Sequence, residues 1–111
     1  MKLKLSVRSL AHPCAEFVFD QFPLVIGRSE EANVTLDDRW ASRRHCLIET
    51  HDGMLIVQDL GSKHGTLLND AIISEAVLKP GDRLSIGLTT LTATYDVVGV
   101  DALDDAGTVR A

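Results

Sequence analysis

Side chains that could hold an anion gather in two short stretches of the chain. Five of the eleven Lys and Arg residues lie there: Arg28, Arg39, Arg43, Arg44 and Lys63. Guanidinium groups grip phosphate through two parallel hydrogen bonds, and Ser42 adds a short hydroxyl donor. Because the chain as a whole carries a net charge of -5, this local basic cluster indicates a small anionic target. Ordinary solvated loop charges are the alternative at this point.

Charge and composition exclude several classes of function. A net charge of -5 argues against a general binder of nucleic acid or of an anionic membrane, because such affinity depends on a broad basic field. Aromatic residues make up only 5% of the chain, fewer than a small protein that stacks on bases usually carries. The sequence therefore predicts neither a nucleic-acid partner nor a membrane partner.

The cysteines and the first residues of the chain indicate its compartment. No apolar run reaches the length of a membrane span, and Met1 to Leu5 lack the apolar stretch of a signal peptide. We therefore expect a cytoplasmic protein in which Cys14 and Cys46 are both reduced. The pairs His12-x-Cys14 and His45-Cys46 match no common zinc-ligand spacing, so we expect no metal and no cofactor.

Short alternating apolar runs separated by turn residues dominate the sequence, which is typical of a β-sandwich. With 111 residues, 45% of them hydrophobic, the chain suits one compact domain. Asp52-Gly53 and Pro80-Gly81 are tight-turn signals, and Asn69-Asp70 can form a third. The expected strands lie at 3–7, 17–19, 24–26, 34–36, 46–48, 55–57, 67–68, 72–73, 84–86 and 91–98. This pattern predicts an all-β, two-sheet antiparallel sandwich.

The chain divides near residue 98. Residues 1–98 carry all the strand signals and form the predicted domain. The residues from Asp101 onward are small and acidic and show no periodicity. We interpret residues 99–111 as a flexible acidic tail or the start of a linker.

Five short motifs follow one another near the ends of the predicted strands. They are Gly27-Arg28, Ser42-x-x-His45, Ser62-x-x-Gly65-Thr66, Asn69, and Gly81-Asp82 followed by Gly87. In this order and spacing, over about residues 3–98, the chain resembles the forkhead-associated (FHA) domain family. The resemblance implies a sandwich of about eleven strands whose apical loops bind phosphothreonine segments of partner proteins, without enzymatic activity.

The resemblance also implies roles for individual residues. Those expected to contact the phosphate are Arg28, Ser42, Arg43 and Lys63, and those expected to contact the peptide are His64 and Asn69. Structural roles fall to Gly27, His45, Ser62, Gly65 and Thr66. Ser42, His45 and Asp59 could otherwise suggest a hydrolytic triad, but the resemblance makes His45 a brace between loops.

Two positions depart from the family pattern, and one other function stays open. His64 stands where the family usually places Asn, and Asn69-Asp70 replaces the usual Asn-Gly. Asp tolerates left-handed backbone less well than Gly, so we expect a strained or altered turn at Asp70. The alternative function is a phosphorylation-independent scaffold or oligomerisation domain, although Arg28 and Ser42 would then have no use. The expected partner is the substrate of a Ser/Thr kinase, and the domain could belong to a larger parent chain.

Overall fold

The computed structural model describes residues 1–9 and 14–96, which form eleven strands. The strands are β1 (Leu3–Arg8), β2 (Ala15–Phe19), β3 (Leu24–Gly27), β4 (Val34–Thr35), β5 (Cys46–His51), β6 (Met54–Asp59), β7 (Thr66–Leu68), β8 (Ala71–Ile73), β9 (Glu75–Leu78), β10 (Arg83–Ile86) and β11 (Thr89–Tyr95). The predicted all-β class is therefore confirmed, and the eleven strands match the number that the resemblance implies.

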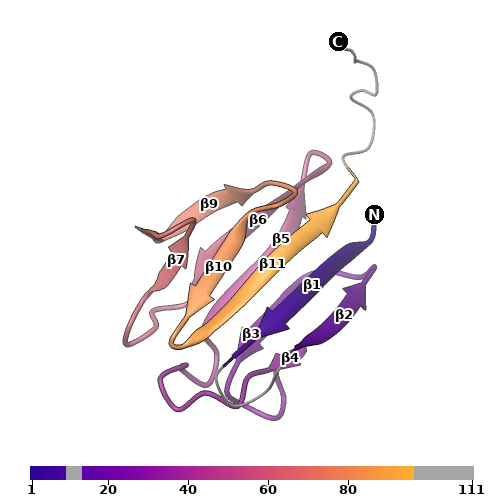
Figure 1. Cartoon of the computed structure of the whole chain (residues 1–111). Coiled ribbons are helices and arrows are strands. Elements are labelled where there is room, and N and C mark those ends of the chain that lie inside the picture. The colour runs from indigo at the N-terminus through magenta and orange to yellow at the C-terminus, as the bar shows by residue number, and fades with distance from the viewer. Residues whose placement is uncertain (10–13, 97–111) are drawn as a thin grey trace.

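Two sheets face each other across the core (Figure 1). One has six strands in the order β2-β1-β11-β10-β7-β8, and the other has five in the order β4-β3-β5-β6-β9. The predicted two-sheet sandwich is thus confirmed. The pairing of β3 with the short β4 is parallel, whereas the other pairs given for the described residues are antiparallel.

The core consists of the inward-facing residues of both sheets. Leu3 and Leu5 of β1 are fully buried and pair in register with Tyr95 and Ala93 of β11. From the other sheet, the buried side chains include Leu24, Ile26, Ile48, Leu55 and Val57. Because strand side chains alternate between faces, every second residue of these strands enters the core. This packed apolar layer supports the loops that connect the strands.

The predicted turns occur where the sequence signals them. Asp52 and Gly53 have φ of 52° and 78°, which is the left-handed pair that a two-residue hairpin requires. Gly81 has φ of 91°, and the Asp82 N–H donates to the Lys79 carbonyl across that turn. Asn69 and Asp70 form a third two-residue turn with φ of 49° and 72°. Asp70 therefore adopts the left-handed backbone for which the family usually supplies glycine.

Strand β9 was not anticipated. Its residues Glu75–Leu78 carry only one fully buried side chain, Leu78, so their apolar alternation is weak. The last strand was expected at 91–98, but it begins at Thr89 and ends at Tyr95. The predicted boundary at residue 98 and the predicted tail at 99–111 lie outside the described residues.

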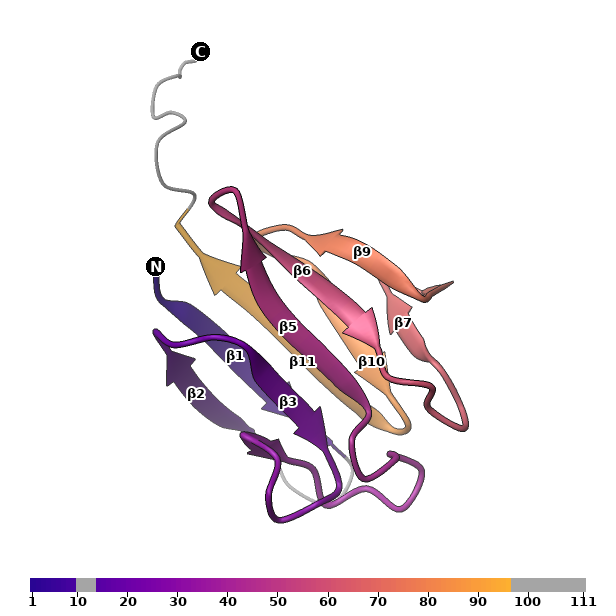
Figure 2. The same ribbon diagram turned by 180° about the vertical axis from the view of Figure 1, so that it is seen from behind.

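The loops that follow β3, β4 and β6 lie together at one end of the sandwich, opposite the N-terminus (Figures 1 and 2). We call residues 28–33, 36–45 and 60–65 the apical loops. They contain most of the residues for which the sequence predicted a binding role. No helix in the described part of the chain has the length and apolarity needed to cross a membrane.

Candidate functional site

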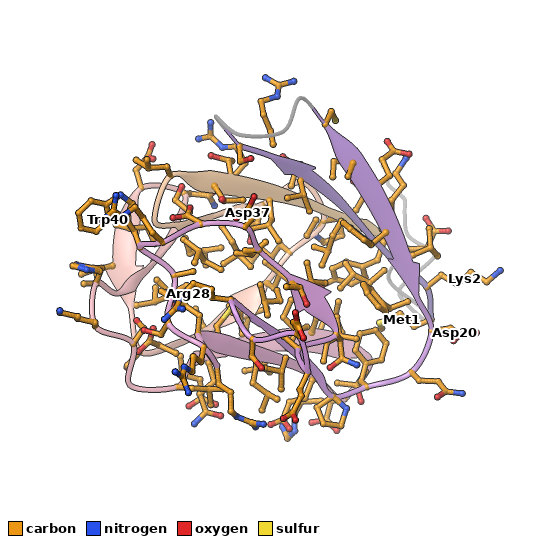
Figure 3. The ribbon with its side chains drawn as sticks, turned by 90° about the horizontal axis from the view of Figure 1, so that it is seen from below. Met1, Lys2, Asp20, Arg28, Asp37 and Trp40 are labelled. Carbon is orange, nitrogen blue, oxygen red and sulfur yellow. The ribbon has the colours of Figure 1, made fainter. Side chains whose placement is uncertain are left out.

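The apical loops enclose a pocket of about 270 Å³. Its lining residues are Arg28, Arg39, Trp40, Ala41, Ser42, Lys63 and His64. Figure 3 looks onto this end of the sandwich and shows Arg28 among the loops with Trp40 at the rim. Arg28, Ser42, Lys63 and His64, which are far apart in the sequence, are thus brought together in one place. We call this the apical pocket.

Backbone pairing places Arg28 beside Ser42. Beyond the end of β3, the Arg28 N–H donates to the Ser42 carbonyl at 3.0 Å, and the Ser29 N–H donates to the Arg43 carbonyl at 3.1 Å. Gly27 makes this close approach possible, because a Cβ there would lie 2.1 Å from the Arg43 carbonyl oxygen. Glycine is therefore needed at position 27 for space rather than for an unusual φ.

Among the described residues, one hydrogen bond holds the guanidinium of Arg28. Its Nε donates to the Ala41 carbonyl at 3.0 Å, and Ala41 is itself buried. That bond fixes the plane of the guanidinium and leaves the end with two Nη groups on an exposed side chain. Two Nη donors in a rigid fork are the arrangement that matches two oxygens of a phosphate or carboxylate.

Ser42 connects two of the apical loops. Its Oγ accepts a hydrogen bond from the Lys63 N–H at 3.0 Å. A hydroxyl that accepts in this way still has its own proton to donate. The contact fixes the Ser42 hydroxyl next to Lys63, so a ligand in the pocket meets a donor whose position is already set.

His45 is fully buried beneath the pocket and joins the same two loops. Its Nδ1 accepts the Ser42 backbone N–H at 3.0 Å, and its Nε2 lies 2.8 Å from the Gly65 carbonyl oxygen. A carbonyl can only accept, so Nε2 carries the proton and the ring is neutral. Neither ring nitrogen faces the Ser42 hydroxyl, so the arrangement is not that of a hydrolytic triad.

Asp59, at the end of β6, organises the loop that carries Lys63 and His64. Ser62 Oγ and Thr66 Oγ1 donate to Asp59 Oδ1 at 2.5 and 2.7 Å, and the Gly61 and Ser62 N–H groups donate to Oδ2 at 3.0 Å. The Gly65 N–H in turn donates to Ser62 Oγ. The Ser62-x-x-Gly65-Thr66 motif is therefore a hydrogen-bonded loop built around one carboxylate.

Asp38 organises the loop that carries Trp40, a role that was not predicted. Its Oδ1 accepts the Trp40 N–H at 2.9 Å, and its Oδ2 accepts the Leu88 N–H and the Thr89 hydroxyl at 2.7 Å each. A Cβ at Gly87 would lie 2.7 Å from both carboxylate oxygens. Glycine at 87 therefore makes room for the Asp38 carboxylate.

Both carboxylates are stabilised in their charged form. Burial acts to raise the pKa of Asp59, but hydrogen bonds from Ser62, Thr66 and the loop backbone outweigh it and lower the pKa. Burial likewise acts to raise the pKa of Asp38, and bonds from Thr89 and from backbone N–H groups lower it overall. The buried Asp38 and the half-buried Asp59 thus anchor the loops as anions, while the pocket above them is lined by cations.

Arg39, Trp40 and His64 form the rim of the pocket. The Arg39 guanidinium carbon lies 5.7 Å from the centre of the Trp40 ring, and the ring centres of Trp40 and His64 are 5.3 Å apart in an edge-on arrangement. Trp40 is 45% exposed. Sequence reasoning did not assign a role to Trp40. The signal that could have found it is a large aromatic residue inside a basic loop segment.

Two predicted contact residues lie outside the pocket lining. Arg43 faces a separate hollow of about 210 Å³ whose lining includes Ser29, Glu31 and Arg44. Asn69 follows β7 and is engaged within the fold, because its amide nitrogen donates to Asp82 and its oxygen accepts the Arg83 N–H. The side chains of Arg43 and Asn69 are thus not gathered with those of Arg28 and Ser42.

The two cysteines do not line the apical pocket. Cys14 and Cys46 are both free thiols, Cys14 exposed and Cys46 buried. Burial raises the pKa of Cys46 to about 12. Within residues 1–9 and 14–96, no three His, Cys, Asp or Glu side chains are grouped to hold a metal ion.

The comparisons with known proteins identify the family. The model of the FHA domain family matches residues 24–87 of the chain. The chain therefore belongs to the FHA family, whose members are phosphothreonine-dependent interaction modules rather than enzymes. The matched segment runs from β3 to the turn after β10 and contains all the lining residues of the apical pocket.

Two curated relatives are bacterial regulators. An oxoglutarate dehydrogenase inhibitor of Corynebacterium efficiens is 38% identical over 73 residues, which cover 66% of this chain and 51% of the relative. The glycogen accumulation regulator GarA of Mycolicibacterium smegmatis is 37% identical over 73 residues, covering 66% and 46%. This chain thus spans about half the length of the curated relatives that it matches.

Solved structures give the same fold. A structure from a study of phosphothreonine-dependent FHA domain interactions superposes with a TM-score of 0.78 at 25% identity and covers 86% of this chain and 98% of that one. The FHA domain of FhaA, solved with the intracellular domain of another protein, has a TM-score of 0.74 at 26% identity and covers 82% and 98%.

Proposed function

We propose that the apical pocket binds the phosphothreonine side chain of another protein, with Arg28, Ser42 and Lys63 as the phosphate-binding residues. A phosphate on threonine carries about -1.5 to -2 charges and three strong acceptor oxygens. The Nη groups of Arg28 supply two donors, the Ser42 hydroxyl a third, and the Lys63 ammonium a second positive charge. Donors and charges therefore match the phosphate in number.

The observation that carries the proposal is the convergence of Arg28 and Ser42 in one pocket, each already held by a hydrogen bond. The Arg28 Nε bonds to the Ala41 carbonyl, and the Ser42 Oγ accepts the Lys63 N–H. Donors that are positioned before binding lose little freedom when the ligand arrives. A scaffold domain that ignored phosphate would gain nothing from such an arrangement.

The peptide around the phosphothreonine would lie across the apical loops. His64 lines the pocket next to Lys63, and this position supports a contact between its imidazole and the peptide backbone, the role that the family pattern implies. Arg43 and Asn69 remain in the proposal although neither lines the pocket. Arg43 would contribute through its backbone beside Ser42, and Asn69 would contact the peptide from the β7–β8 turn.

The proposed partner is a protein phosphorylated by a Ser/Thr kinase. The relatives that are named as regulators support a role in signalling, and they favour a cytoplasmic setting. We do not propose a nucleic acid or a membrane as partner, because the net charge of -5 provides no broad basic surface. We take residues 1–98 as the binding domain, which could be one part of a longer protein.

Calorimetry with a phosphothreonine peptide library tests the proposal. Each peptide is measured beside the same peptide with plain threonine. We expect measurable binding to a subset of the phosphorylated peptides and none to their unphosphorylated partners. Equal affinity for both forms throughout the library would contradict the proposal and favour the phosphorylation-independent scaffold.

A further inference from the structure

The apical pocket holds more positive charge than one phosphate requires. Its lining includes three permanent cations, Arg28, Arg39 and Lys63, and no Asp or Glu is among the described residues that line it. One phosphate brings at most about two negative charges. If Arg28 and Lys63 neutralise that phosphate, the charge of Arg39 is left without a counterpart in the ligand.

Arg39 lies on the rim of the pocket beside Trp40. Its guanidinium carbon is 5.7 Å from the centre of the Trp40 ring, and the centre of that ring is 5.3 Å from the centre of the His64 ring. Arg39 and Trp40 come from the same loop as Ser42, residues 36–45, whereas His64 comes from the loop that follows β6. The rim therefore joins the loop of residues 36–45 to the loop of residues 60–65, where His64 is the neighbour of Lys63.

The loop beneath Arg39 is fixed. The Trp40 N–H is bound to the buried Asp38 carboxylate, and the Ala41 N–H donates to the Asp38 carbonyl at 3.0 Å. Within the described residues, the Arg39 guanidinium makes this cation–π contact with Trp40 and no hydrogen bond or ion pair. Arg39 is thus a cation in a defined place with donors available to a ligand.

We propose that Arg39 determines specificity for a second anionic group on the ligand, close in sequence to the phosphothreonine. The ligand class is then a phosphothreonine segment with an acidic neighbour, supplied either by the carboxylate of Asp or Glu or by a second phosphate. This inference rests on the proposed function, because it assumes that Arg28, Ser42 and Lys63 hold the first phosphate.

Fluorescence anisotropy with matched labelled peptides tests the inference. One peptide carries phosphothreonine among neutral residues, a second set carries Glu at each of the three positions before and after it, and a third set carries a second phosphothreonine instead. For wild type we expect at least one acidic position to bind about three- to tenfold more tightly than the neutral peptide, as an added charge-assisted contact would give. Whether Glu or the second phosphate gives the gain identifies its source.

Three variants assign the gain to Arg39. Arg39→Gln should remove the preference for the acidic neighbour and keep the dependence on the first phosphate, and Arg39→Lys should restore part of the preference. Arg44→Gln is the control with the same loss of charge, because Arg44 lines a different hollow, and it should keep the preference. Equal binding of neutral and acidic peptides by wild type, or a preference that survives Arg39→Gln, would overturn the inference while leaving phosphate binding intact. Loss of phosphate dependence in wild type would instead overturn the proposed function, and this inference with it.

Discussion

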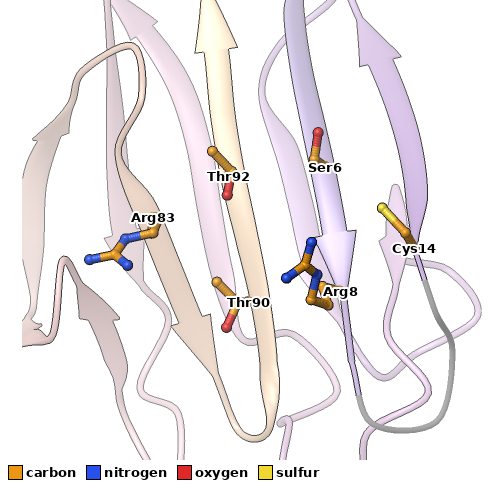
Figure 4. A pocket seen from close by; sticks show the side chains of 6 residues that line it. All are labelled: Ser6, Arg8, Cys14, Arg83, Thr90 and Thr92. Carbon is orange, nitrogen blue, oxygen red and sulfur yellow. The ribbon is translucent and has the colours of Figure 1, made fainter.

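Two hollows of the same volume, about 270 Å³, lie on this domain and contain arginine, yet they are built differently. One of them is the apical pocket. The other, which we call the outer hollow, lies on the outer face of the six-stranded sheet, with Arg8 and Arg83 beside Ser6, Thr90 and Thr92 (Figure 4). Figure 4 shows the Arg8 guanidinium reaching toward Thr90, while that of Arg83 points away from both threonines. Arg83 already has a carboxylate neighbour, since its Nη2 lies 3.8 Å from Asp70 Oδ2.

The proposed anion site therefore differs from the outer hollow in the convergence of its donors, rather than in its volume or arginine content. In the outer hollow, Arg8 and Arg83 lie on strands β1 and β10, so the sheet sets the directions of their side chains. In the apical pocket three loops bend toward one another, and Arg28 and Ser42 are held there by buried groups beneath them. Preorganised donors keep more of their interaction energy on binding.

The largest expected effect separates the two hollows directly. Arg28→Ala should weaken binding of a phosphothreonine peptide by about 30-fold or more, because removing one partner of a desolvated charge pair costs about 2–5 kcal/mol. Arg8→Ala removes the same charge from the outer hollow and should change the affinity less than about twofold. Calorimetry on both variants makes the comparison, and equal losses would mean that only net charge matters.

The support beneath the pocket gives the next effect. His45→Ala should lower the free energy of unfolding by about 2–4 kcal/mol, because it removes a fully buried side chain and leaves the part-buried Ser42 N–H and Gly65 carbonyl without partners. His51→Ala, at an exposed strand end, is the control and should be nearly neutral. Chemical denaturation measures both, and amide shifts in the variant should concentrate at the apical pocket rather than the outer hollow. An unchanged free energy of unfolding in His45→Ala would refute the role of His45 as a brace between the loops.

Acid should loosen the apical pocket through Asp59. Its pKa is lowered in the folded state, so the unfolded chain binds more protons in that range and stability rises with pH. The contribution is fully present above the ordinary carboxyl pKa of 3.8 and is lost as the pH falls through the lowered value. Asp59→Asn should cost about 1.5–3 kcal/mol at neutral pH and flatten the acid limb. Denaturant titrations between pH 7 and 2 test this, and an unchanged acid limb would contradict it.

A smaller effect concerns the methyl group of the ligand. Phosphothreonine should bind more tightly than phosphoserine by about 0.8 kcal/mol or somewhat more, the value of one buried methyl and its cavity. Two peptides that differ only in this residue suffice. Equal affinity would remove the preference for threonine and leave the dependence on phosphate unaffected.

The smallest effect belongs to the turn beside the outer hollow. Asp70→Gly should raise the free energy of unfolding by about 0.5–1 kcal/mol, because glycine adopts the φ of 72° without strain. The lost contact with Arg83 is exposed and contributes little. This change also frees Arg83 from its carboxylate, yet it should create no phosphate binding when Arg28 is absent. Phosphopeptide binding by the double variant Asp70→Gly, Arg28→Ala would contradict the proposed difference between the outer hollow and the apical pocket.

Much of the fold could be predicted from short-range patterns. Alternation identified β1 and β2, a short apolar run identified β3, and Asp52-Gly53 and Pro80-Gly81 marked turns because only certain residues adopt positive φ. The parallel pairing of β4 and the presence of β9 could not be read in this way. Their residues carry too few buried side chains, and their pairing depends on neighbours far away in the sequence.

The candidate site, like the fold, could be predicted only in part from the sequence. Ordered motifs placed Arg28, Ser42 and Lys63 near one another, and the structure brings them into one pocket. The direction of a loop side chain is a tertiary property, which is why Arg43 was expected in the pocket and instead faces another hollow. Asp38 was missed because a single carboxylate in a loop looks solvated until Leu88 and Thr89 close over it.

Asp38 holds its loop through the Trp40 N–H and its own carbonyl, so no side chain of residues 39 and 40 takes part in the anchoring. The rim can therefore change in sequence while the backbone that presents it stays in place. A library randomised at positions 39, 40 and 64 would sample new flanking preferences while Arg28, Ser42 and Lys63, the proposed phosphate-binding residues, stay unchanged. The domain is therefore suited as a scaffold for engineered phosphopeptide-binding reagents in which Asp38 is kept.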